Sequence, residues 1–358
     1  MPSRVRVIVA ALVVAVAAAD GRAAAQEPIV VRAHVFFYGD NTEFRNPFRE
    51  GETIFGAAGS VTADIEAAPR VTLSLGGFVN QRFGSDRAVD LARPVLSLAI
   101  AGRRSSFLLG TFPARDTRGP SGPDRMGPHG LLPALQRETL AFERPYEAGL
   151  QWRFAGATLR HEMWLAWQRL NTAEHRERFD AGLEGELRAS RAVSIPVQIH
   201  IVHQGGQLYA SGPVADSAAA AAGVNIHAQA GPLGRASLEL FGLASRYVAD
   251  RSRPGLSRDG VGFFGRATAE RGGWRAHLIA WRGRNVIKDE GDPNYLSVTR
   301  AGARYHGTRD YAEAGLSRRF TFGQTTRLDV AGRLHRVENH YEYSYRITST
   351  VAIGWRVR

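Results

Sequence analysis

The chain has no cysteine, a single lysine, and only one long apolar run, which lies at its amino terminus. Without cysteine, disulfide bonds and thiolate metal sites are excluded. Beyond the amino-terminal run, no stretch reaches the roughly 18 apolar residues that a membrane-spanning helix requires, so a helical inner-membrane protein is excluded. Because Lys288 is the only lysine, nearly all the positive charge is arginine, which we attribute to high-GC codon usage.

The amino terminus has the layout of a secretory signal peptide. Two arginines precede an apolar run over residues 7–19, and alanines at 23–25 suit a signal peptidase. We expect residues 1–25 to be removed and residues 26–358 to form a single domain. No cysteine follows the run, which excludes a lipoprotein anchor.

Most segments after residue 28 alternate apolar and polar residues with a period of two, which predicts strands with one apolar and one polar face. The last segment places Tyr343, Tyr345, Ile347, Val351, Ile353, Trp355 and Val357 on one face and Ser344, Arg346, Thr348, Thr350 and Arg356 on the other. Short connections alternate with longer polar ones, which is typical of an outer-membrane barrel with short periplasmic turns and long external loops. A large soluble all-β protein is the alternative, and the unequal connections argue against it.

The sequence therefore predicts an all-β, transmembrane antiparallel β-barrel of about 16 strands, with 14 to 18 possible, in the outer membrane of a Gram-negative bacterium. The expected strands start near residues 29, 52, 70, 92, 105, 145, 157, 178, 192, 217, 235, 260, 273, 310, 326 and 342. Residues 295–305 would pass as a further strand. Because an even count returns both termini to the periplasm, we place 283–309 in one external loop.

Barrels of 16 to 18 strands leave an aqueous channel. A charge on the lipid face costs roughly 2–4 kcal/mol at the midplane, so the polar faces should line the lumen. The predicted pore-lining residues are Arg153, Arg160, Glu162, Asp180, Glu184, Glu186, Arg188, Arg266, Arg275, Glu313, Arg319, Arg327, Asp329, Arg333 and Arg346. The aromatics expected on the lipid face are Trp152, Phe154, Trp167, Phe179, Trp274 and Trp355.

The other long connection, Ala114–Arg144, is rich in glycine, proline and charge. It has the position and length of the porin loop that folds into the barrel and narrows it, and an external lid is the alternative. The candidate constriction residues in it are Arg115, Arg118, Asp124, Arg125, Arg137 and Glu138.

The formal net charge of +12 comes mostly from short turns and two loops, because the predicted wall is nearly balanced. Arginines at those positions suit the phosphates of lipopolysaccharide. We expect outer-membrane lipid and lipopolysaccharide as partners and no nucleic acid, since the arginines are dispersed on an exported chain. The predicted function is a porin-like channel for passive diffusion of small hydrophilic solutes, with mild anion selectivity; a homo-oligomer is left open.

Enzyme motifs are missing: the chain has no G-x-S-x-G, H-E-x-x-H, P-loop or EF-hand pattern. We therefore expect no enzyme, no cofactor and no metal. The alternative is a barrel enzyme that hydrolyses lipid or peptide, for which His335 with Glu342 and Ser344 is the best candidate set among the lumen histidines His200, His277 and His335. A closed barrel with a structural or adhesive role is the third hypothesis.

Four short patches carry a resemblance: Asn41–Phe44, Gly51–Thr53, Gly291–Pro293 and Tyr343–Tyr345. They resemble a group of uncharacterised Gram-negative outer-membrane barrel proteins, which implies the same fold across most of the mature chain. The chain departs from such barrels at its end, because residues 355–358 lack the final aromatic residue that the assembly machinery reads.

Overall fold

The computed structural model describes residues 29–114, 127–302 and 307–357, which form sixteen antiparallel strands closed into a barrel. The strands are β1 (Ile29–Glu43), β2 (Glu52–Ala68), β3 (Val71–Arg82), β4 (Leu91–Ala101), β5 (Ser105–Pro113), β6 (Tyr146–Ala155), β7 (Leu159–Arg169), β8 (Glu177–Arg188), β9 (Val193–Gly205), β10 (Ala215–Gln229), β11 (Arg235–Val248), β12 (Ser257–Arg271), β13 (Trp274–Arg284), β14 (Thr308–Phe322), β15 (Thr326–Val337) and β16 (His340–Val357). Short helices are α2 (Leu140–Glu143), η1 (Gly231–Leu233), η2 (Pro254–Leu256) and η3 (Pro293–Tyr295). None of these helices is long and apolar enough to cross a membrane.

The strand count and the long connection between β13 and β14 confirm the predicted barrel, and each strand begins within three residues of its expected start. The expected signal peptide and the predicted loop residues Arg115, Arg118, Asp124 and Arg125 lie outside the described residues.

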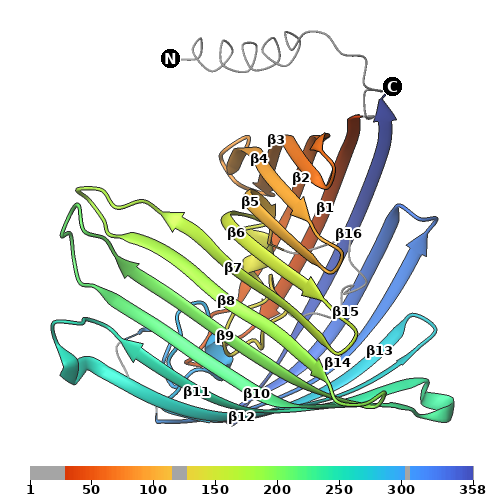
Figure 1. Cartoon of the computed structure of the whole chain (residues 1–358). Coiled ribbons are helices and arrows are strands. Elements are labelled where there is room, and N and C mark those ends of the chain that lie inside the picture. Colours follow the sequence, from red (N-terminus) through yellow and green to blue (C-terminus); the bar gives the residue numbers. More distant parts are fainter. Residues whose placement is uncertain (1–28, 115–126, 303–306, 358) are drawn as a thin grey trace.

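Strands β1 and β16 pair with each other and close the barrel, with Asp40 opposite Arg346 and Thr42 opposite Ser344. The first residues of β1 and the last of β16 lie at one end, called here the terminal end (Figure 1). Short turns join the strands at this end, and the opposite end, called here the loop end, carries the longer connections together with the two-residue hairpin 338–339 between β15 and β16.

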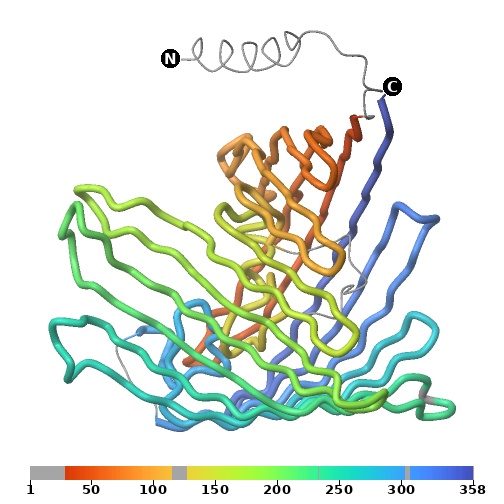
Figure 2. Tube along the Cα trace, in the orientation of Figure 1, coloured from red at the N-terminus to blue at the C-terminus, as the bar shows by residue number. Residues whose placement is uncertain are grey.

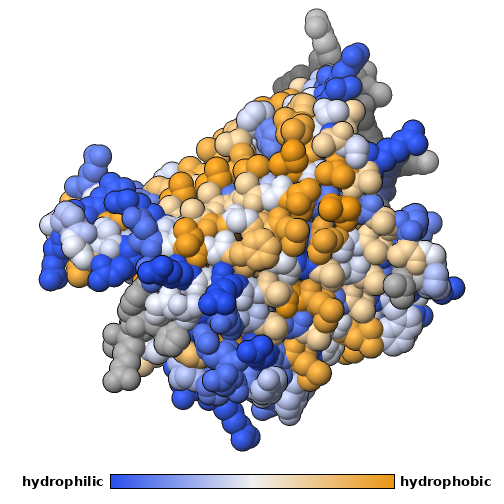
Figure 3. All heavy atoms as spheres, turned by 90° about the horizontal axis from the view of Figure 1, so that it is seen from below, coloured by the Kyte–Doolittle hydropathy of each residue, from blue (hydrophilic) through white to orange (hydrophobic). Residues whose placement is uncertain are grey.

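Side chains alternate strictly between the outside and the interior of the wall. In β9, Ile195, Ile199 and Ile201 are exposed, whereas Gln198 and His200 between them are buried inside. Apolar side chains gather into a band across the outer wall in the view of Figure 3. Such a band is what a membrane-spanning barrel presents to lipid. Four of the six aromatics predicted on this face are exposed, namely Trp152, Trp167, Trp274 and Trp355.

Inside the terminal half, opposite charges on neighbouring strands face each other. Arg266 of β12 donates to Glu239 of β11 at 2.7 and 2.6 Å, and Arg319 of β14 donates to Asp329 of β15 at 2.7 Å. Cavities of about 260 to 370 Å³ lie between these side chains. This half of the interior therefore combines paired charges with empty space.

The loop half is packed instead. Segments 127–144 and 285–302 run inside the ring of strands (Figure 2). Their buried side chains, including Leu131, Leu135 and Tyr295, form one apolar cluster with wall residues such as Trp164 and Phe264. We call these two segments the plug. An aqueous interior was expected from the strand number, but at the loop end the plug fills the space that the wall side chains do not reach.

Backbone hydrogen bonds hold the two plug segments to each other. Arg137 N donates to Glu290 O at 2.6 Å, and Asp292 N donates to Pro133 O at 2.8 Å. Gln198 of β9 fixes the first segment to the wall by accepting from Leu132 N at 2.8 Å. The plug is thus one unit bonded to the barrel wall.

Candidate active site

Five strands around the closing β1–β16 pair bring polar side chains together near the loop end. On β16, Ser344 lies between Thr42 of β1 and Arg333 of β15, which are its direct cross-strand partners. His335 of β15 lies opposite Glu313 of β14. Because side chains alternate along each strand, this register points all of these groups into the interior.

A chain of hydrogen bonds links a serine to a carboxylate through a histidine. Ser344 Oγ lies 2.8 Å from His335 Nε2, and His335 Nδ1 lies 2.8 Å from the Tyr311 hydroxyl. Tyr311 donates to Glu313 Oε2 at 2.5 Å. Since Tyr311 uses its only proton on Glu313, its oxygen accepts from Nδ1–H of His335. Nε2 is then the unprotonated nitrogen that accepts the Ser344 hydroxyl proton.

This arrangement has the parts of a serine hydrolase site: a nucleophile, a base, and an acidic group that orients the base. Glu313 Oε2 is itself 3.5 Å from His335 Nδ1, and Glu313 Oε1 is 2.7 Å from His277 Nε2. The carboxylate is therefore held from two sides, and it fixes the imidazole tautomer through Tyr311.

Glu342, the acid expected beside His335, has a different role. It is the direct cross-strand partner of His335, but its carboxylate accepts from Arg45 N, Asn46 N and Asn46 Nδ2 at 2.5 to 2.7 Å. It therefore holds the loop after β1 in place. The expected pairing with Ser344 is present, and Glu313 takes the position assigned to Glu342.

Two arginines bring positive charge next to the serine. Arg333 Nη1 and Arg346 Nη1 donate to Glu138 of the plug at 2.9 and 2.5 Å, and Arg346 Nη2 donates to Asp40 at 2.5 Å. The Nε atoms of both arginines are buried without a hydrogen-bond partner among the described residues. Both guanidiniums and Ser344 line one cavity of about 30 Å³, which is room for one or two waters.

Loop residues cover this cavity. Phe44 lies edge-on to His335, with ring centroids 4.9 Å apart, and Pro133 of the plug lines the same space. Arg49 reaches across to Asp292 at 2.6 Å and so joins the loop after β1 to the plug. A substrate larger than water therefore enters only when these loops move.

Most of the predicted lumen residues either form ion pairs between neighbouring strands or belong to the candidate active site. Those in cross-strand ion pairs are Arg153 with Glu162, Arg160 with Glu184 and Glu186, Arg266 with Glu239, Arg275 with Glu270, and Arg319 with Asp329. Arg327 lines a cavity at the terminal end, and Arg188 is exposed at that end of β8. Glu313, Arg333 and Arg346 belong to the candidate active site, and Asp180 lies elsewhere, beside His200. Among the predicted constriction residues, Arg137 pairs with Glu143, and Glu138 holds the two site arginines.

A comparison with protein families concerns the function of the whole chain. Residues 21–357 match the family described as lipid A 3'-O-deacylase-type. The chain belongs to that family. This membership contradicts the expectation that the chain is not an enzyme, which rested on the lack of linear catalytic motifs. The groups of this site come from separate strands, so no short motif would reveal them.

Solved structures that resemble the chain are outer-membrane barrels. A loop-deletion variant of OmpT, an outer membrane protein of Vibrio cholerae, aligns with a TM-score of 0.56 and 10% identity, covering 91% of this chain and 99% of the other. The anion-selective porin from Comamonas acidovorans aligns with a TM-score of 0.54 and 10% identity, covering 91% of this chain and 100% of the porin. OccK8 (OprE) of Pseudomonas aeruginosa aligns with a TM-score of 0.54 and 11% identity, covering 92% of this chain and 98% of OccK8. At this identity they establish the porin-like barrel fold. No curated protein sequence matches the chain.

Proposed function

We propose that this protein is an outer-membrane lipid hydrolase that removes an ester-linked acyl chain from a lipid A-type glycolipid, with Ser344 as nucleophile and His335 as general base. The observation that carries the proposal is the hydrogen-bonded series from Ser344 through His335 and Tyr311 to Glu313. Membership of a deacylase family supplies the substrate class.

The proposed reaction follows the roles of these atoms. Ser344 Oγ attacks the ester carbonyl carbon while His335 Nε2 takes its proton. The bond from the acyl carbon to the sugar oxygen then breaks, and the sugar oxygen takes that proton from His335 and leaves as a hydroxyl group. Water then hydrolyses the acyl-serine ester, with His335 again taking and returning a proton. The buried guanidiniums of Arg333 and Arg346 stabilise negative charge on the carbonyl oxygen. They also suit the phosphates of the glycolipid.

The position in the barrel fits a substrate of the outer leaflet. His335 lies two residues before β15 ends at Val337, at the loop end. In outer-membrane barrels the long loops face the outside of the cell. This position supports the proposal, because lipid A belongs to the outer leaflet, and we expect the loops over the site to open when an acyl chain enters.

The test is mass spectrometry of lipid A incubated with the purified protein in detergent. We expect the wild type to release one ester-linked acyl chain and Ser344→Ala to lower kcat by about a thousandfold or more, as for loss of a triad nucleophile. The matched control is Ser349→Ala, because Ser349 pairs with the lipid-facing Phe37 on the opposite face of β16. Full activity in Ser344→Ala, or no deacylation by folded wild type, would overturn the proposal.

A further inference from the structure

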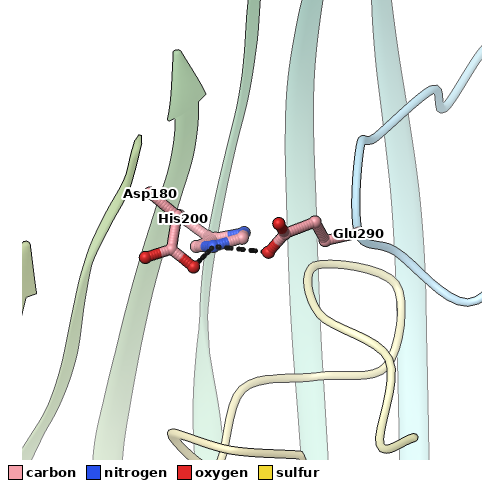
Figure 4. A group of neighbouring side chains, drawn as sticks. All are labelled: Asp180, His200 and Glu290. Carbon is pink, nitrogen blue, oxygen red and sulfur yellow. Dashed lines mark ion pairs between the residues drawn. The ribbon is translucent and has the colours of Figure 1, made fainter. Parts of the chain in front are cut away.

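A second polar cluster lies on another sector of the wall, away from the strands that carry Ser344 and His335. Asp180 of β8, His200 of β9 and Glu290 of the plug point toward one another (Figure 4). One oxygen or nitrogen of each lies within 4.8 Å of the others. Asp180 and His200 are fully buried, and the Glu290 side chain is 7% exposed.

The facing atoms of this cluster have no hydrogen bonds. Among the described residues, neither Asp180 oxygen, nor His200 Nε2, nor Glu290 Oε2 has a hydrogen-bond partner. His200 Nε2 is 3.6 Å from Asp180 Oδ2 and 3.8 Å from Glu290 Oε2, too far for hydrogen bonds. Buried polar atoms are almost always paired, so three unpaired groups that each direct one atom toward the others indicate a binding site for a ligand.

The surrounding contacts orient these groups in the manner of metal ligands. His200 Nδ1 lies 3.1 Å from the carbonyl oxygen of Leu135, and as donor to it leaves the Nε2 lone pair facing the two carboxylates. Glu290 Oε1 is held by Gln168 at 2.8 Å and Arg144 at 2.9 Å, which leaves Oε2 free. A lone pair facing two carboxylates is repulsive unless a proton or a metal cation lies between them.

The neighbouring cations Lys288 and Arg144 reduce the negative charge of the cluster, but their direct contacts are with other oxygens. Lys288 Nζ donates to the backbone oxygen of Asp289, and Arg144 is bonded to the far oxygen of Glu290. Within the described residues, the one ion-pair partner of Asp180 is His200.

We propose that Asp180, His200 and Glu290 bind a divalent transition-metal ion of the zinc type. One imidazole nitrogen with two carboxylate oxygens suits zinc better than magnesium or calcium, which prefer oxygen ligands. Around a tetrahedral zinc ion, ligand atoms lie roughly 3.3–3.5 Å apart. The separations from His200 Nε2 are 3.6 and 3.8 Å and all three atoms lie within 4.8 Å of one another, so rotation of the side chains is needed to bring the ligand atoms to these distances.

The ion adds a link between the wall and the plug to the hydrogen bonds and apolar contacts that already join them. Two ligands come from the wall and the third from the plug segment after β13, while Leu135, which fixes His200, belongs to the plug segment before β6. An open pocket of about 410 Å³ lined by Arg144, Arg178 and Glu290 reaches the plug ligand of the site, whereas Asp180 and His200 lie behind it. Metal binding therefore fastens both plug segments to the wall.

The test measures zinc binding to the folded full-length protein, after chelation and dialysis, by titration with zinc chloride and by metal analysis. We expect one equivalent in the wild type and at least a hundredfold weaker binding in His200→Gln. His203→Gln is the matched control, because His203 lies on the same strand and bonds to Asp216 instead. Asp180→Asn is the second variant if His200→Gln does not fold.

Cobalt(II) gives an independent readout, since a tetrahedral site produces intense visible absorption that appears in the wild type and is lost in Asp180→Asn. The proposal would be overturned if the folded wild type takes up no stoichiometric zinc, or if His203→Gln weakens zinc binding as much as His200→Gln does. Because binding is also measured in Ser344→Ala, the result does not depend on hydrolysis.

Discussion

Glu138 of the plug is the single carboxylate that holds both site arginines, so its replacement by glutamine tests the plug and the site together. Arg333 and Arg346 bond to the same Oε2 atom, and all three side chains are at most 20% exposed. Removing one partner of a buried ion pair costs about 3–5 kcal/mol. We expect the lower end, about 3 kcal/mol, because Arg346 keeps Asp40 and Arg333 keeps Glu313 at 3.7 Å.

The assay is denaturant unfolding in lipid vesicles, followed by tryptophan fluorescence, with limited proteolysis of the plug as a second readout. Glu143→Gln is the matched control, because Glu143 lies in α2 of the same plug and pairs with the half-exposed Arg137. A pair of that kind contributes about 0–1 kcal/mol. If Glu138→Gln and Glu143→Gln destabilise the protein equally, the arginine pair is not held through Glu138.

The pH dependence of the unfolding free energy provides a second test of the role of Glu138. Burial alone would raise the pKa of Glu138, but Arg333 and Arg346 outweigh it and hold that pKa well below its ordinary value of 4.5. A depressed carboxyl pKa means stabilisation that is complete above the unfolded value and is lost as the pH falls toward the folded value. The difference between wild type and Glu138→Gln should be constant at neutral pH and shrink only below about pH 4.5. A difference that shrinks already between pH 8 and 6 would point to another group.

Two further predictions concern the plug. His129, stacked on Trp164, has its pKa lowered by burial but raised overall to about 10 by Glu147 and Glu162, at 2.9 and 2.7 Å. The protonated imidazole, paired with both carboxylates, stabilises the docked plug, and this stabilisation is complete below pH 6.5 and is lost as the pH rises toward 10. Proteolysis of the plug should therefore increase between pH 6.5 and 10. His129→Gln should abolish this dependence, and an unchanged profile would contradict it. Replacing residues 114–144 by a short turn should raise the single-channel conductance in planar bilayers well above that of the wild type, and equal conductances would show that the plug does not obstruct the interior.

The sequence predicted the barrel well because each strand carries its own period-two signal, as in β9 and β16. Part of the site could also be predicted from the sequence. The short turn Gly323–Thr325 sets the register that puts Glu313 opposite His335, and the hairpin at 338–339 sets His335 opposite Glu342. The hairpin register favoured Glu342 as the acid, but a register does not show that this carboxylate turns away to the loop after β1.

The remaining site residues could not be predicted in the same way. Asp40 and Thr42 meet Arg346 and Ser344 only through the β1–β16 pairing, which joins residues about three hundred positions apart. No turn fixes that register. The packing of the plug was equally hidden, because Leu131, Leu135 and Tyr295 lie in segments without a strand or long helix period.

The β1–β16 pairing also determines when the catalytic groups exist as a set. Ser344 and Arg346 belong to the last strand to be synthesised, and Asp40 and Thr42 belong to the first. Until these edges join, the nucleophile lacks one of its two flanking strands and the plug has no enclosure to fill. Under the proposed function, a chain that has not yet closed would be inactive toward the lipids that it meets, and hydrolytic activity would arise only with closure. Barrel closure would then act as an activation step, as removal of a propeptide does in a secreted zymogen.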